Sequence, residues 1–386
     1  MLNFDDSDSS YSNDVPYSSA LKLPKRSKKQ PSATGLEFNR GEKQPLTYDI
    51  KIINGQTDQN QLIPFKYNGQ PQAPWQRYLD SLQNNWHPVE ISMSQDIASW
   101  KQDHLTEAEK HLVMWNLGYL VSADSLVANN VILGIYEHIT SPEARQYYAR
   151  QIFEEALHTH SYQHIIESLG LDGEDHAMFN KYRTIDSIAD KAEWNLDFTK
   201  ALADKSVTPG SIDANRLLIE DLVAFLVFEG LYFWCAFAHI FCLARNGKMV
   251  NTAEQYQYIM RDENQHFQHA LWVLNQIKQE YPKLWNAKTE QRARAIINEA
   301  VELERAYAID CMPDGGVSGL PVNTYIKYVE YTANVRCVQL SLKPLFKVSE
   351  DPMPWMDEMV NIRKEKNFFE TRVTDYRAGG SLEGTW

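Results

Sequence analysis

Two short motifs contain the residues whose types and spacing could do chemistry. Both have the form Glu-x-x-His, and they are Glu155-Ala-Leu-His158 and Glu263-Asn-Gln-His266. Because residues three apart lie on one face of an α-helix, each motif can direct a carboxylate oxygen and an imidazole nitrogen at one metal ion. A chain with 11 histidines is expected to contain one such motif by chance, so a metal site requires further acids nearby.

Two further acids lie in strongly apolar segments. Asp124 has apolar neighbours on both sides, and Glu229 directly follows the seven apolar residues 222–228. Burying a bare carboxylate is costly unless a charge or a metal compensates it. Either acid alone could pair with a Lys or Arg of another helix or reach solvent. One acid from each of two helices and Glu-x-x-His from each of two others, however, is the ligand set of ferritin-like di-iron and di-manganese carboxylate bundles.

The candidate ligands of two metal ions are therefore Asp124, Glu155, His158, Glu229, Glu263 and His266. An oxygen-rich set with two imidazoles suits iron or manganese, and the lack of cysteine ligands disfavours structural zinc or an iron-sulfur cluster. Two redox-active ions that share carboxylates can pass electrons to dioxygen. Oxygen activation is thus the expected chemistry.

Tyr162 is the residue that indicates which type of oxygen chemistry the site performs. It lies four residues after His158 on the same helical face, so its ring is expected near the metals. A tyrosine on a core face is more often only packing. Phe233, Phe237 and Ile259 lie at helical spacing from the ligands of their own segments and can enclose an apolar pocket around Tyr162, although the same spacing fits ordinary core packing.

The elements that position these residues are predicted to be long helices. From Pro74 onward, apolar residues repeat at three and four spacing, which is typical of an all-α bundle. Ser141-Pro142 predicts a helix start and Asn246-Gly247 a helix end. Helices are expected near 74–86, 106–139, 142–169, 175–203, 213–247, 252–281, 287–311 and 322–342.

The ends of the chain have a different composition. Residues 1–45 are rich in Ser, Asp, Lys, Asn and Pro and are expected to form a disordered arm, whose basic stretch at 25–29 we interpret as a solvated linker. The helical domain is expected over 46–350, with a short irregular or extended lead-in at 46–72. Residues 351–386 form a C-terminal segment that is expected to end in a flexible tail.

Charge and composition exclude some classes of function. The net charge of −13 argues against a nucleic-acid surface. The apolar stretch Leu222–Ala244 is long enough to span a bilayer, but Glu229 and His239 interrupt it, so no membrane is expected. Four cysteines without a CxxC pair are interpreted as reduced thiols, and no signal peptide is recognisable. A cytoplasmic protein is expected.

The sequence resembles the small, radical-generating β subunit of class I ribonucleotide reductase from about Trp86 to Tyr376. The resemblance rests on the order and spacing of four segments, which are Asp124 in Ser-Ala-Asp-Ser, Glu155-x-x-His158-x-x-x-Tyr162, Glu229, and Arg261-Asp262-Glu263-x-x-His266. It implies a ferritin-like fold, a homodimer and a di-iron cofactor. Some members of the family use manganese-iron or di-manganese and replace the radical tyrosine, so Tyr162 and Asp124 favour di-iron here.

The resemblance also implies a mechanism. Reduced di-iron would react with dioxygen and oxidise Tyr162 to a stable radical, which then travels to a cysteine of the large subunit, where ribonucleotides become deoxyribonucleotides. The family's relay of tryptophan, aspartate and metal-bound histidine corresponds to Trp86, Asp262 and His158. From the residues alone, Asp262 could instead only bridge Arg261, and Trp86 could be only a core aromatic.

The C-terminal tail is the expected link to the large subunit. Tyr376 resembles the family's flexible relay tyrosine, and residues 379–386 would dock on the partner. A disordered segment that folds on binding spends part of its interaction energy on ordering, so the contact is expected to be exchangeable.

Two other readings stay open. A di-iron oxygenase of the same fold would act on a substrate bound within this chain and would need neither Trp86 nor the tail. A metal-storage protein would not need Tyr162.

Overall fold

The structure is a computed structural model in which residues 51–55, 66–67, 70–71, 73–102, 104–171 and 180–359 are described. The N-terminal arm, including the basic stretch at 25–29, lies outside the described residues. So do Tyr376 and the C-terminal tail, and their predicted roles stay predictions.

The described part of the chain is mainly helical, as predicted. The helices of eight or more residues are α1 (Ala73–Gln83), α2 (Ser94–Lys101), α3 (Glu107–Asn130), α5 (Pro142–Leu169), α8 (Asp186–Leu202), α9 (Ile212–Val227), α10 (Phe233–Arg245), α11 (Val250–Glu280), α12 (Ala287–Cys311) and α13 (Val322–Gln339). Shorter pieces are η1 (Pro88–Glu90), α4 (Tyr136–His138) and α7 (Lys181–Thr184). Two small antiparallel hairpins pair β1 (Lys66–Tyr67) with β2 (Gln70–Pro71) and β3 (Gly316–Val317) with β4 (Leu320–Pro321).

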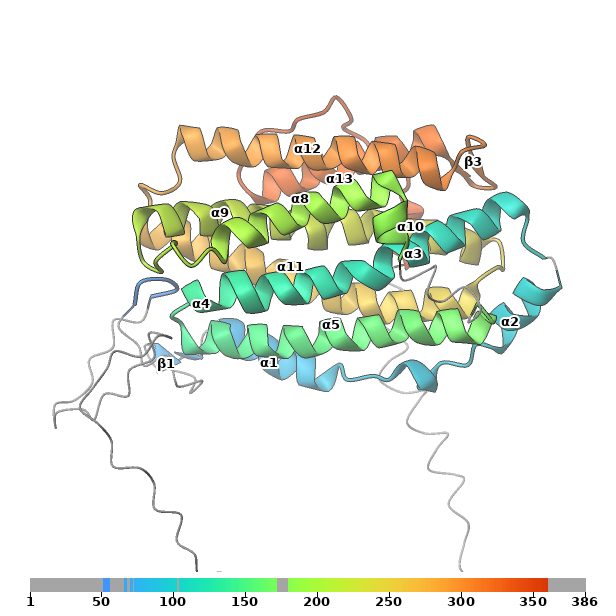
Figure 1. Ribbon diagram of the computed structural model, residues 1–386, viewed down its shortest axis with the longest axis horizontal. Coiled ribbons are helices and arrows are strands. Elements are labelled where there is room, and N and C mark those ends of the chain that lie inside the picture. The colour runs from blue at the N-terminus through green and yellow to red at the C-terminus, as the bar shows by residue number, and fades with distance from the viewer. Residues whose placement is uncertain are drawn as a thin grey trace, which may run out of the picture. The chain divides into compact units, whose positions relative to one another are not determined.

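The long helices lie side by side in layers (Figure 1). Helices α12 and α13 pack together at the top of the view and α1 packs on α5 at the bottom, with α3, α8, α9, α10 and α11 between them. Helix α3 packs on α5 and α11 packs on α10, α9 and α5. The helices that carry the candidate ligands therefore surround one shared core.

Two long helices contain a π-helical turn. Helix α3 continues through η2 (Val131–Ile135) into α4, and α9 continues through η3 (Phe228–Tyr232) into α10. A π turn inserts one extra residue and re-aims the side chains around it, and such turns are frequent at functional sites. Glu229 lies in η3. A Cβ on its neighbour Gly230 would stand 2.5 Å from the ring of Phe267, so only glycine permits this close helix contact.

Local sequence signals explain where the helices begin and end. Ser141 accepts a hydrogen bond from the backbone N–H of Ala144, and Gly247 has φ +73°, which confirms the predicted start of α5 and end of α10. Asp96 in α2 accepts hydrogen bonds from the backbone N–H groups of Asn251 and Thr252. Its carboxylate thus satisfies the first turn of α11, where a helix favours negative charge.

The structure corrects two of the predicted ranges and adds one helix that was not predicted. Helix α1 ends at Gln83, so Trp86 lies in the following loop and not on the helix. Within the predicted helix 175–203, Ile185 has extended backbone and separates α7 from α8, while 172–179 are not described. The prediction missed α2, because two turns of helix are too short to show an apolar period.

Among the described residues, two continuous helices are long and apolar enough to span a membrane by composition. They are Glu107–His138 and Ile212–Arg245, and 61% and 94% of their most apolar windows are buried inside the protein. The second helix contains Leu222–Ala244, the apolar stretch identified in the sequence. Its composition is explained by its place in the core of the bundle. The four cysteines are free and buried, as expected.

A buried ion pair joins α8 to α12. Lys191 Nζ of α8 donates to Glu304 Oε2 of α12 at 2.6 Å, and neither side chain is exposed. Tyr325 of α13 donates its hydroxyl to the other Glu304 oxygen at 2.6 Å. The ammonium also lies over the rings of Tyr119, Tyr232 and Tyr307 at 3.5, 4.2 and 4.2 Å. The hydroxyl of Tyr325 and the three rings therefore offset part of the cost of desolvating the pair.

Replacing Lys191 by Met should lower the free energy of unfolding by about 3–5 kcal/mol, because it leaves Glu304 buried without its cation. The matched control is Lys200→Met on the same helix, whose pair with Asp197 at 3.6 Å is exposed, so its loss should cost no more than about 1 kcal/mol. Chemical denaturation measures both. Equal losses in the two variants would contradict this account of the pair.

Candidate metal centre

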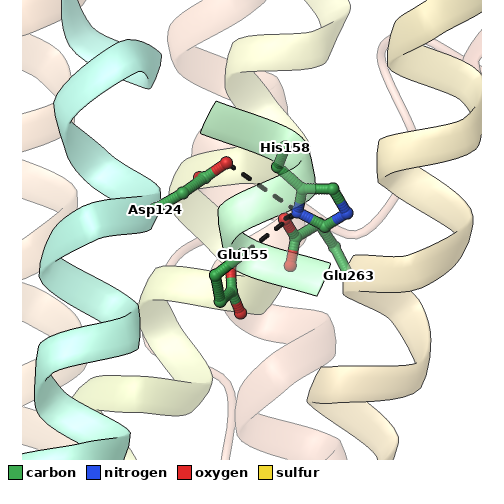
Figure 2. Close-up of side chains that lie close together, drawn as sticks. All are labelled: Asp124, Glu155, His158 and Glu263. Carbon is green, nitrogen blue, oxygen red and sulfur yellow. Dashed lines mark ion pairs between the residues drawn. The ribbon is translucent and has the colours of Figure 1, made fainter. Parts of the chain in front are cut away.

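The six candidate ligands come together in the core from four helical segments. Asp124 comes from α3, Glu155 and His158 from α5, Glu229 from η3, and Glu263 and His266 from α11. Figure 2 shows four of them, with Asp124, Glu155 and Glu263 gathered around His158. All six side chains are buried, with exposures of 1% or less.

Their ligand atoms form two overlapping groups. The first consists of Asp124, Glu155, His158 and Glu263, and the second of Glu155, Glu229, Glu263 and His266. Within each group the ligand atoms lie within 4.8 Å of one another. Glu155 and Glu263 belong to both groups. Because each carboxylate has two oxygens, these two residues can bridge a pair of ions, and the groups could hold a di-metal site.

Each imidazole presents the same nitrogen to the carboxylates. His158 Nδ1 lies 3.0 Å from Glu263 Oε1, 3.7 Å from Glu155 Oε2 and 3.8 Å from Asp124 Oδ2. His266 Nδ1 lies 2.9 Å from Glu263 Oε2, 3.2 Å from Glu155 Oε1 and 3.8 Å from Glu229 Oε2. The i,i+3 spacing of each motif thus places its Glu and His on one face, as the sequence predicted.

The buried carboxylates of the cluster favour the binding of cations. Burial, followed by the charge of Glu263, raises the pKa of Asp124 and Glu229 well above their usual values. Both Asp124 oxygens, Glu155 Oε2, His158 Nδ1, Glu229 Oε2 and Glu263 Oε1 are buried without a hydrogen-bond partner. Buried polar atoms rarely stay unpaired, so atoms that converge in this way fit metal ions. The donor set of oxygens and imidazole nitrogens suits iron or manganese.

A second carboxylate orients each histidine from outside the cluster. His158 Nε2 lies 3.4 Å from Asp262 Oδ2, and His266 Nε2 lies 2.9 Å from Glu154 Oε2. Such contacts fix the ring and leave the other nitrogen for a metal. The sequence analysis found Asp262 but missed Glu154. The signal for Glu154 was the symmetry of the two motifs, since the glutamate of each Glu-x-x-His motif directly follows another acid in the sequence.

Trp86 contacts Asp262, the carboxylate that orients His158. Its Nε1 donates to Asp262 Oδ2 at 2.8 Å, and its ring stacks near His158 with centroids 6.4 Å apart. Asp262 also accepts from Arg261 through its other oxygen, Oδ1, at 3.1 Å. The bridge to Arg261 and the contacts with Trp86 and His158 are therefore present together, and Trp86 is hydrogen-bonded as well as packed in the core.

Tyr162 is fully buried, and its hydroxyl has no hydrogen-bond partner. Burial, followed by the charge of Asp124, raises the pKa of this hydroxyl well above its usual value. Tyr256 meets its ring edge-on at 5.8 Å, and Phe237 packs on Tyr256 at 5.5 Å. The sequence analysis did not identify Tyr256, which lies seven residues before Glu263 on the helix face of the ligands.

Gln151 is a further polar contact that the sequence analysis missed. Its Nε2 donates to Glu155 Oε1 at 3.1 Å and to Glu229 Oε1 at 3.2 Å. It lies four residues before Glu155, one helical turn away on α5. The amide therefore links the ligands of two helices and helps to hold the Glu229 side chain.

Comparisons with known proteins agree with this geometry. The family model of the ribonucleotide reductase small chain matches residues 59–354. A curated ribonucleoside-diphosphate reductase subunit beta from Chlamydia pneumoniae is 43% identical over 333 residues, which cover 86% of this chain and 94% of that protein.

Two solved structures share the fold. The ribonucleotide reductase R2 subunit from Clostridium botulinum matches with a TM-score of 0.73 and 24% identity over 80% of this chain and 94% of that one. The dimanganese(II)-NrdF structure from Streptococcus sanguinis matches with a TM-score of 0.63 and 19% identity over 77% of this chain and 99% of that one. The chain therefore belongs to the ribonucleotide reductase small-chain family, whose members work with a large subunit to reduce ribonucleotides.

Proposed function

We propose that this chain holds two metal ions, activates dioxygen, and stores the resulting oxidising equivalent as a radical on Tyr162. The radical is passed to a large subunit, which reduces ribonucleotides to deoxyribonucleotides. The observation that carries the proposal is the pair of buried ligand groups that share Glu155 and Glu263. A shared pair of carboxylates is the arrangement that two cooperating ions require.

The ligand assignment follows from the two groups. Asp124 and His158 would hold one ion, Glu229 and His266 the other, and Glu155 and Glu263 both. Two iron ions held there would supply the electrons for dioxygen and a one-electron oxidant for a nearby phenol. Iron is our assignment from the oxygen-rich donors. Manganese or a mixed manganese-iron pair is the alternative, and the dimanganese protein of the same fold supports keeping it.

Tyr162 is the best placed phenol for oxidation. It lies on the helix of Glu155 and His158, and its hydroxyl is unpartnered, shielded from water and close enough to Asp124 to be affected by its charge. The hydroxyl of neighbouring Tyr256 instead donates to Asn116 Oδ1 at 2.8 Å. A radical needs protection from solvent, and the apolar core around Tyr162 gives it.

The route to the partner is proposed to begin with Trp86. The chain His158, Asp262 and Trp86 runs outward from the metal centre through contacts of 3.4 and 2.8 Å. Beyond it we propose that Tyr376 and residues 379–386 contact the large subunit, and that the chain works as a homodimer. An oxygenase that acts on a substrate within this chain would have no use for this outward route. Four buried reduced cysteines fit a reducing compartment such as the cytoplasm.

Glu229→Ala should reduce the metal content below two ions per chain, because it removes a ligand that belongs to one group only. Metal analysis after loading with Fe(II) measures the content. The control is Glu220→Ala, which removes an acid of the same helical segment whose partner is Arg292 at 3.0 Å. Two ions per chain retained in Glu229→Ala would refute the ligand assignment.

Tyr162→Phe should abolish the tyrosyl signal in the electron paramagnetic resonance spectrum after Fe(II) loading and exposure to oxygen, while the metal content stays unchanged. The matched control is Tyr256→Phe, which removes an equally buried hydroxyl nearby and should keep the signal. If Tyr256→Phe lost the tyrosyl signal and Tyr162→Phe kept it, the radical would lie on Tyr256, and our assignment to Tyr162 would be wrong. If the unmutated protein and both variants lacked the tyrosyl signal, another metal pair or the oxygenase function would be favoured.

Trp86→Phe should keep the bound metal but lower deoxyribonucleotide formation with the large subunit by more than about tenfold, a barrier increase above about 1.4 kcal/mol. The substitution removes the indole N–H that contacts Asp262. The control is Trp285→Phe, because Trp285 packs on Lys278 with the ammonium 3.7 Å from the ring and does not belong to the relay. Unchanged turnover in Trp86→Phe would contradict the proposed route.

A further inference from the structure

Tyr256 is a second tyrosine beside Tyr162, and the proposed function leaves it unoxidised. Both side chains are fully buried, and their rings meet edge-on with centroids 5.8 Å apart and planes at 89°. Tyr256 lies on α11, about two helical turns before the candidate ligand Glu263. Burial and distance therefore do not explain why one phenol would be oxidised and the other would not.

The two hydroxyls differ in their hydrogen bonds. The Tyr162 hydroxyl has no hydrogen-bond partner among the described residues, whereas the Tyr256 hydroxyl donates to Asn116 Oδ1 of α3 at 2.8 Å. A phenol that loses an electron becomes strongly acidic, so its oxidation is easiest where a base accepts the proton. The oxygen of a carboxamide is a very weak base. The hydrogen bond to Asn116 therefore keeps the proton on Tyr256 and makes this phenol hard to oxidise.

Two further contacts fix the orientation of the Asn116 amide. Its Nδ2 donates to the backbone carbonyl of Ala236 on α10 at 2.8 Å and lies 3.3 Å from His239 Nδ1. Because a carbonyl oxygen only accepts, the amide nitrogen must face Ala236 and the amide oxygen must face Tyr256. Asn116 is itself fully buried. The amide thus presents only its oxygen to the phenol.

His239 is a base on the far side of this amide. The imidazole is fully buried, and burial, followed by the charge of Lys191, lowers its pKa to about 3. The ring is therefore neutral near pH 7. Since Asn116 Nδ2 can only donate, His239 Nδ1 is the acceptor in their contact, and the ring proton lies on Nε2. A neutral imidazole nitrogen is more basic than an amide oxygen.

Asn116 separates this base from the phenol. To pass a proton from Tyr256 to His239, the amide would have to accept one proton on Oδ1 and release another from Nδ2. That exchange produces an imidic acid, which is a strongly unfavourable form of an amide. A carboxyl group of the same size could instead accept the phenol proton on one oxygen. If it already held a proton, it could release that proton from its other oxygen to the imidazole.

We propose that Asn116 determines which tyrosine is oxidised, because it holds the hydroxyl proton of Tyr256 in place and so keeps the radical on Tyr162. The inference rests on the proposed radical function. It adds a positioning residue on α3 that acts through Tyr256.

The test gives Tyr256 a proton acceptor in a chain that lacks the Tyr162 hydroxyl. Tyr162→Phe alone should show no tyrosyl signal in the electron paramagnetic resonance spectrum after Fe(II) loading and exposure to oxygen. Tyr162→Phe/Asn116→Asp should show one. One electron then leaves Tyr256 for the oxidised metal centre, the O–H bond at Tyr256 Oη breaks, and the proton goes to the introduced carboxyl. Adding Tyr256→Phe to this double variant should remove the new signal.

Two controls separate proton acceptance from other effects of the substitution. Asn116→Leu breaks the hydrogen bond of Tyr256 but supplies no base, so it should give no signal in the Tyr162→Phe chain. Gln255→Glu adds a carboxyl at an equally buried position on α11, where the side chain contacts Ser161 of α5. It should also give no signal in the Tyr162→Phe chain.

A second measurement tests the hydrogen bond without the radical chemistry. Denaturation midpoints of the Fe(II)-loaded protein are measured without oxygen for Asn116→Leu, Tyr256→Phe and the variant with both substitutions. Because each single substitution breaks the same hydrogen bond, the double variant should lose less than the sum of the two single losses. Additive losses would overturn the proposal, because Asn116 would then not restrain the Tyr256 hydroxyl.

Metal content is measured before the spectra. If Tyr162→Phe/Asn116→Asp binds fewer than two ions per chain, Asn116→His replaces Asn116→Asp, because an imidazole also accepts a proton without adding a buried negative charge. Absence of the new signal with two ions bound would overturn the proposal, and so would an equal signal in either control. A signal in Tyr162→Phe alone that Tyr256→Phe removes would also overturn it. Unmutated protein that forms no tyrosyl radical would instead contradict the proposed function.

Discussion

The burial of four carboxylates at one point is the constraint on which the rest of the structure depends. Asp124, Glu155, Glu229 and Glu263 lie in the core, where desolvation and mutual repulsion oppose their charged forms. Packed side chains alone cannot offset this cost, but two divalent cations can. The long helices around the cluster fix the ligands from four directions, so the binding of ions and the stability of the bundle are coupled.

The contacts outside the cluster differ between its two histidines, so the site has a direction. Asp262 and Glu154 each hold the far nitrogen of one histidine, but only Asp262 continues to an aromatic residue, Trp86. The aromatic contact therefore lies on the Asp262 side of the site, next to His158.

Much of the site could be predicted from the sequence because helical spacing is a strong geometric rule. Glu-x-x-His places two candidate ligands on one face, and an acid in an apolar helix is costly without a partner, so the six residues that the structure brings together could be identified as candidates. The π turns were not, since they depend on packing such as that of Gly230 against Phe267. Gln151 and Tyr256 were missed for a related reason. Each contacts a residue of another helix, Glu229 for Gln151 and Tyr162 for Tyr256, and the pattern of a single helix does not show which residues face it.

The most direct test of the central claim is anomalous diffraction at the iron absorption edge from crystals of the Fe(II)-loaded protein. The account predicts two anomalous peaks in the core, one contacted by Asp124 and His158 and the other by Glu229 and His266, with Glu155 and Glu263 contacting both. A single peak, or peaks bound by other residues, would contradict it.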